Sequence, residues 1–97
     1  MDAYTTPWTR ARLLKAMDKK FPGNTFRKGE DFDSGYKGQI WTGEDAFDKD
    51  GINLFNYYPT YGLWDDCGVR TQLAELLEKA GWRAECHDPG TYFLTDD

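Results

Sequence analysis

Three groups of residues in this 97-residue chain combine side chains and spacings that chemistry uses. The first surrounds Gly51, which follows Asp48 and Asp50 as the glycine of a calcium-binding loop follows its acidic ligands. Such a loop also needs oxygen ligands at its first and twelfth positions. With Gly51 as the sixth residue of the loop, those positions hold Ala46 and Tyr57, which do not supply them. We therefore expect an acidic hairpin turn here and no bound metal.

The second group consists of the two cysteines and the single histidine. Structural zinc sites usually contain closely spaced cysteine pairs, whereas Cys86 and His87 are adjacent and would point to opposite faces of a strand. A Cys67 thiolate with His87 as its base would suit a hydrolase. Asp65 and Asp66 disfavour that thiolate, because like charges lie beside it. We expect no cofactor and no catalysis, and a Cys67–Cys86 disulfide remains sterically possible.

The third group is a set of basic side chains on one predicted helix, a pattern that can contact nucleic-acid phosphates. The net charge of −5 works against this, because an acidic domain repels phosphate backbones. No helix-turn-helix, RNA-recognition or zinc-finger pattern accompanies the basic residues. A small nucleic-acid-binding module therefore remains the alternative interpretation, and a solvated helix face is favoured. The residues are Arg10, Arg12, Lys15, Lys19 and Lys20.

Acidic and aromatic side chains are concentrated in residues 29–66. This segment holds nine Asp and Glu against two Lys, a local charge of −7, and nine of the sixteen aromatic residues. Carboxylates spaced over a sheet and its loops imitate a phosphate backbone, and exposed rings supply the contact area that carboxylates lack. We expect this segment to bind a basic protein surface. The predicted contact residues are Glu30, Asp31, Asp33, Glu44, Asp45, Asp48, Asp50, Tyr57, Tyr58, Tyr61 and Trp64.

Two helices are predicted from apolar residues at helical spacing. The first begins at Thr6 and Pro7, which suit the cap and the first helical position, and ends at the following Pro-Gly pair. The second is capped by Asp65 or Asp66 and ends at Gly81, where a left-handed backbone is needed. The buried stripe of the second helix is formed by Val69, Leu73, Leu76, Leu77 and Ala80.

The remaining segments predict short strands. Asp50 and Gly51 favour a tight turn before the third strand, and residues 88–90 favour one before the last. The order α-β-β-β-α-β-β predicts an α+β fold, an antiparallel sheet of four to five strands with two helices packed on one face. Residues 1–97 are expected to form a single domain. The predicted strands are residues 25–28, 36–42, 52–58, 82–87 and 91–95.

The N-terminus shows no secretory signal and no stretch is apolar enough to cross a bilayer, so a cytoplasmic protein is expected. In size, acidity and aromatic content the chain resembles small phage-encoded inhibitors of host defence, including anti-CRISPR proteins. The resemblance covers the composition of the whole chain and no motif, so it carries no residue roles. It implies a non-catalytic protein that blocks nucleic-acid recognition or nuclease recruitment. We expect the partner to be a host protein with a basic nucleic-acid-binding surface, no direct binding of nucleic acid or membrane, and a monomer or homodimer in the host cytoplasm.

Overall fold

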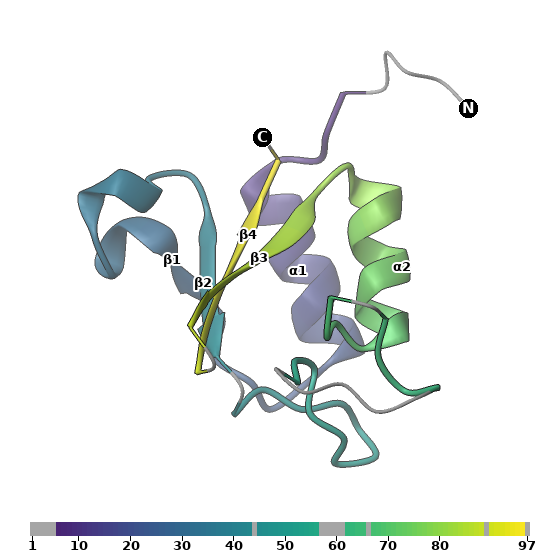
Figure 1. Cartoon of the computed structure of the whole chain (residues 1–97). Helices are drawn as coiled ribbons and strands as arrows, with labels where there is room; N and C mark the ends of the chain where they lie inside the picture. Colours follow the sequence, from purple (N-terminus) through teal and green to yellow (C-terminus); the bar gives the residue numbers. More distant parts are fainter. Residues whose placement is uncertain (1–5, 44, 57–61, 66, 89, 97) are drawn as a thin grey trace.

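An antiparallel sheet with strand order β1-β2-β4-β3 carries two helices on one of its faces (Figure 1). The computed structural model describes residues 6–43, 45–56, 62–65, 67–88 and 90–96. This arrangement confirms the predicted α+β class. The elements, in chain order, are α1 (Arg10–Lys20), β1 (Arg27–Lys28), the short 3-10 helices η1 (Gly29–Asp31) and η2 (Ser34–Tyr36), β2 (Ile40–Gly43), α2 (Thr71–Ala80), β3 (Arg83–Asp88) and β4 (Thr91–Thr95).

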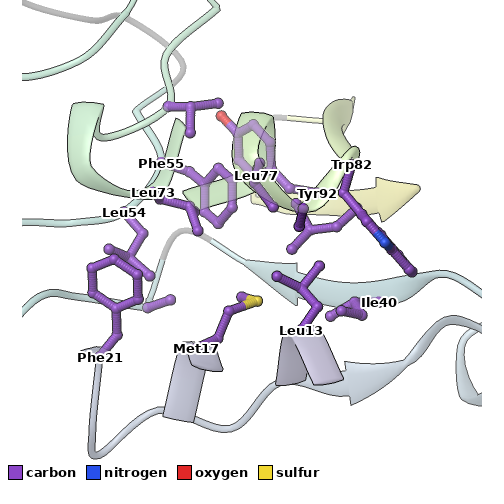
Figure 2. Packing of buried hydrophobic residues seen from close by; sticks show 14 residues of the cluster. Leu13, Met17, Phe21, Ile40, Leu54, Phe55, Leu73, Leu77, Trp82 and Tyr92 are labelled. Carbon is purple, nitrogen blue, oxygen red and sulfur yellow. The ribbon is translucent and has the colours of Figure 1, made fainter. Parts of the chain in front are cut away.

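The core lies between the sheet and the two helices. Side chains alternate along a strand, so Ile40, Tyr92 and Leu94 point to the helix-covered face, where all three are buried. Figure 2 shows Ile40 and Tyr92 among apolar side chains from both helices, and Leu94 belongs to the same cluster. Burial of one such side chain contributes about 2 kcal/mol to folding. The helical contribution comes from Leu13, Met17, Leu73, Leu77 and Ala80.

Helix α1 begins later than the sequence predicts. Thr9 is its cap, and the Thr9 hydroxyl accepts a hydrogen bond of 3.2 Å from the Arg12 backbone N–H. The preceding residues are held against α2 instead, because the Trp8 N–H donates to the Ala80 carbonyl at 2.9 Å. The Trp82 indole N–H in turn donates to the Trp8 carbonyl at 2.8 Å. These tertiary hydrogen bonds keep residues 6–9 out of the helix.

Helix α2 ends as predicted but does not begin as predicted. Gly81 closes it with a φ of 76°, in the left-handed region. At the other end, the cap residue Arg70 makes no side-chain capping bond. The Asp65 carboxylate caps a separate turn, because it accepts from the N–H groups of Cys67 and Val69 at 2.9 Å each. The alternative predicted cap, Asp66, lies outside the described residues.

In the described part of the strand predicted at residues 52–58, residues 52–56 form irregular chain with isolated bridges. Phe47 pairs with Asn53, and Phe55 pairs with Val69. Leu54 and Phe55 are adjacent and both fully buried, so this irregular segment is packed on both sides. The predicted turn before this segment is present, with Gly51 at a φ of 81°. Residues 57 and 58 lie outside the described part of the chain.

The other strands are found where the sequence places them, with shorter bounds at the N-terminal end of the sheet. The segment predicted as residues 25–28 pairs only at Arg27 and Lys28, and the one predicted as 36–42 begins at Ile40, after η2. The final hairpin is confirmed: β3 and β4 pair across a turn in which the Gly90 N–H donates to the Asp88 carboxylate at 3.0 Å.

Candidate functional site

The predicted acidic residues fall into two separate groups. Asp31 and Asp33 belong to the segment of η1 and η2, on the opposite side of the sheet from the helices (Figure 1). Asp45 and Asp50 are exposed on the loop of residues 45–56, at the lower end of the molecule in Figure 1. Glu44 lies outside the described residues. The described acids therefore do not form one continuous face.

Asp48 belongs to the protein interior and is removed from the set of predicted contact residues. Its side chain is 2% exposed, and Oδ2 accepts from Arg70 Nε at 3.0 Å. Oδ1 accepts from the N–H groups of Asp50 and Ile52 at 2.9 Å each. Burial alone raises the pKa of Asp48, but the hydrogen bonds from Ile52, Arg70 and Asp50 outweigh it and hold the pKa below its ordinary value. This carboxylate organises the loop.

Glu30 connects η1 to α1 and its charge is compensated. Its two carboxylate oxygens accept from the two Arg10 Nη atoms at 2.7 and 3.0 Å, a bidentate pair. Arg10 also donates to the Gln39 carbonyl at 3.1 Å. The hydrogen bond from Arg10 is the main cause that lowers the pKa of Glu30 from 4.5 to about 2. Glu30 therefore positions the segment that follows it.

The Arg10–Glu30 pair predicts an acid-sensitive contribution to stability. Because the pKa of Glu30 is lowered on folding, the contribution is fully present above pH 4.5 and is lost as the pH falls towards about 2. We expect Glu30→Gln to remove this part of the pH dependence in urea unfolding measured between these values. Glu78→Gln, an exposed carboxylate of α2, is the matched control. If the free energies of unfolding of wild type and Glu30→Gln changed in parallel with pH, the contribution assigned to Glu30 would be contradicted.

Of the predicted aromatic contacts, only Trp64 lies among the described residues. It is half-buried, and its indole N–H donates to the Asn53 carbonyl at 2.9 Å, so it fastens the loop of residues 45–56. Tyr57, Tyr58 and Tyr61 lie outside the described part of the chain.

The described exposed aromatic surface lies on the other face of the sheet, over β4. Phe93 points away from the helices and is buried there, stacked on Tyr36 with ring centroids 3.8 Å apart and an interplanar angle of 6°. Phe32 meets Phe93, Trp41 and His87 edge to face at 5.2, 5.1 and 5.3 Å. Each such ring pair contributes about 0.5–1.5 kcal/mol beyond its buried area. We call Phe32, Tyr36, Trp41, His87 and Phe93 the ring cluster.

Phe32 and His87 are the exposed members of the ring cluster. The Phe32 side chain is 40% exposed, although it touches four other rings. Asp31 and Asp33, both exposed, flank it in sequence. The Asp33 carboxylate also accepts from the Gly35 N–H at 3.2 Å and so caps η2. An anchored ring between two carboxylates can contact a partner that is both apolar and basic.

His87 takes part in this surface in a way that the sequence did not suggest. Its Nδ1 lies 3.1 Å from the Tyr36 hydroxyl, and its ring lies 5.7 Å from Phe93. The neighbouring Cys86 pairs with Tyr92, whose side chain faces the helices. The two adjacent residues thus point to opposite faces, as expected from strand alternation. The signal that identifies this cluster is Phe93, which alternates with Tyr92 and therefore needs cover on the second face.

The thiols and the basic helix provide no comparable constellation. Cys67 and Cys86 are both free and exposed, and Cys86 Sγ lies 3.3 Å from the Asp88 carbonyl oxygen. Among the described residues, no group of three or more His, Cys, Asp or Glu side chains is arranged to hold a metal ion. On α1, Arg10 is paired with Glu30 and the Arg12 guanidinium lies 4.0 Å from the centroid of the Trp8 ring. The exposed lysines of α1 are Lys15, Lys19 and Lys20.

Comparison with known proteins adds no assignment. No protein-family model, no curated protein and no solved structure matches the chain. None of the helices in the described part is long and apolar enough to cross a membrane. The geometry of the ring cluster and its flanking acids is therefore the basis on which a function is proposed.

Proposed function

We propose that this chain is a non-enzymatic protein-binding module, a phage-type inhibitor that occupies a basic nucleic-acid-binding surface of a host protein. The observation that carries the proposal is Phe32, an exposed ring that is fixed by four ring contacts and flanked by Asp31 and Asp33. Blocking of such a surface by an acidic mimic, as in anti-CRISPR proteins, is the mode of action that this arrangement supports best.

The energetic argument rests on the fixed position of Phe32. Aromatic hot spots contribute most when little side-chain freedom is lost on binding. The ring cluster already restricts Phe32 through edge-to-face contacts with Trp41, His87 and Phe93. The Arg10–Glu30 pair restrains the backbone of η1 directly before it. Binding therefore orders few new groups, and the contact area of the ring is used efficiently.

The charge argument rests on Asp31 and Asp33. Exposed carboxylates around an apolar anchor accelerate encounter with a basic surface and disfavour acidic partners. The net charge of −5 acts in the same direction over the whole chain. Screening over about 8–10 Å at physiological salt predicts that complex formation weakens as salt rises. The same charges repel free nucleic acid, so the proposed partner is the protein that binds it.

The test is affinity capture from host lysate with wild type and three variants. Phe32→Ala is expected to weaken the captured complex by roughly 30-fold, the loss for a hot spot of about 2 kcal/mol. Asp31→Asn with Asp33→Asn should slow association and flatten its salt dependence. Glu75→Gln with Glu78→Gln, which removes the same charge from exposed positions of α2, is the matched control. Surface plasmon resonance with the captured protein gives the affinities and rates.

Two further results decide between this proposal and the alternative. The captured protein should lose its binding to DNA or RNA when wild-type chain is added, and keep it when Phe32→Ala is added. In a gel-shift assay at physiological salt, the chain alone should retard neither DNA nor RNA. Retardation that depends on Lys15, Lys19 and Lys20 would overturn the proposal and support a nucleic-acid-binding module that uses α1.

A further inference from the structure

A groove of about 470 Å³ lies beside the end of β2, a volume within the range of small-ligand sites. The chain between α1 and β1 forms one wall, through residues 23–27. The loop of residues 45–47 forms another, and the start of β4 closes the far end. Trp41 belongs both to this groove and to the ring cluster, where it meets Phe32 at 5.1 Å. The groove and the ring cluster therefore share this side chain.

The groove exists because two strand pairings end at different points. The pairing of β1 with β2 stops at Arg27 and Trp41, whereas the pairing of β2 with β4 continues to Gly43. Asn24 holds the opposite wall in place. Its side-chain amide donates to the Phe47 carbonyl at 2.7 Å, and its side-chain oxygen accepts from the Phe47 N–H at 2.9 Å. The space is thus bounded by fixed elements on both sides.

The lining combines aromatic rings and a carboxylate. Trp41 is half-buried, and the Phe47 side chain is 40% exposed. Asp45 is exposed at the groove. Thr42 lines it too, but its side chain is buried and, by strand alternation, faces the helices together with Ile40.

Arg27 shows how a guanidinium meets an aromatic ring of this groove. Its guanidinium lies 5.0 Å from the centroid of the Trp41 ring, a cation–π contact within the protein itself. A second guanidinium can stack on Phe47 and donate in a fork to the Asp45 carboxylate. The described lining contains two charged side chains, Arg27 and Asp45. Together they set the orientation of the bound ligand residue. Asp45 receives the guanidinium, and Arg27 donates to the backbone carbonyl of the same ligand residue.

We propose that this groove receives an arginine side chain presented by an extended segment of the protein partner. The inference rests on the proposed function for the identity of the partner, and it adds the residue type that the partner inserts beside Phe32. Arginine is preferred over lysine, because a planar guanidinium stacks on a ring and forms two parallel hydrogen bonds to a carboxylate. A basic nucleic-acid-binding surface supplies such arginines in positions that normally meet phosphate.

The test uses N-acetyl-L-arginine methylamide as the probe in an NMR titration of the whole chain. Shifts are expected at the Trp41 indole and at the amides of Thr42, Gly43 and Asp45, with a dissociation constant in the millimolar range, as is usual for a ligand of about 16 heavy atoms. Asp45→Asn should weaken the probe by about threefold to fivefold. Asp50→Asn, which removes an exposed charge from the same loop outside the groove lining, should leave it unchanged.

An equal response to N-acetyl-L-lysine methylamide, or equal weakening by Asp45→Asn and Asp50→Asn, would overturn the guanidinium assignment. This result would leave the effect of Phe32→Ala on the partner complex intact. Conversely, if Phe32→Ala left the affinity for the partner unchanged, the probe titration would still show the expected shifts. The two proposals can therefore be refuted separately.

Discussion

Asp48→Asn is expected to lower the free energy of unfolding by about 3 kcal/mol, the cost of leaving a buried charge without its partner. The variant keeps an acceptor for the N–H groups of Asp50 and Ile52. It removes the carboxylate that pairs with Arg70, whose side chain is 9% exposed. Urea unfolding measures the loss. A loss of this size indicates a buried ion pair, whereas the exposed acid that the sequence alone predicts at this position would give a much smaller loss.

The double variant Asp48→Asn with Arg70→Met shows whether the charge itself causes the loss. Methionine removes the uncompensated guanidinium and retains an apolar stem, so more than half of the lost stability should return. Glu85→Gln is the control for an exposed ion pair. Arg83 Nη2 lies 3.1 Å from Glu85 Oε2, and both side chains are largely exposed. That change should cost less than about 0.5 kcal/mol. A double variant no more stable than Asp48→Asn would contradict this explanation.

Gly68→Ala is expected to destabilise the protein by about 3 kcal/mol, through a backbone strain and a collision that add together. Gly68 has a φ of 82°, and a Cβ at this position would meet the Asn56 carbonyl oxygen far inside van der Waals contact. The two backbones are joined there, because the Asn56 N–H donates to the Gly68 carbonyl at 2.8 Å. Relief of the collision would break this link between the loop and the start of α2.

Gly51→Ala is the matched control for Gly68→Ala. Its φ of 81° is nearly the same, but an added Cβ meets no atom within 4 Å. Gly51→Ala should therefore lower the free energy of unfolding only by the cost of a left-handed alanine, about 1–2 kcal/mol. The difference between the two variants in urea unfolding measures the close backbone approach at Asn56. Equal losses would show that the conformation of Gly68, and not its neighbour, limits substitution.

The elements predicted from local signals are present. Apolar residues at helical spacing predicted both helices, and Gly81 marks the end of α2 because only a residue tolerant of positive φ fits there. The final hairpin follows from turn residues between two alternating runs. Element boundaries were less predictable, because hydrogen bonds to distant residues decide them. Thr9 rather than Thr6 caps α1 since Trp8 is bound to the end of α2.

The candidate site depended on contacts that local signals do not report. Asp48 and Asp50 look alike in the sequence, yet Asp48 is buried on Arg70 and Asp50 is exposed. Phe32 was one of several aromatic residues in an acidic segment. Its fixed position on the surface arises only because Phe93 and His87, from the distant C-terminal hairpin, contact it.

The sequence by itself determined the α+β class, the helix faces and the turns, because each depends on residues within a few positions of one another. The tertiary structure alone decided which carboxylates carry free charge, which rings are exposed, and where the groove opens beside β2. Those properties depend on residues far beyond the reach of local signals, such as Arg10 with Glu30, 20 positions apart, and Arg70 with Asp48, 22 positions apart. Burial and pairing across such separations arise only when the chain has folded.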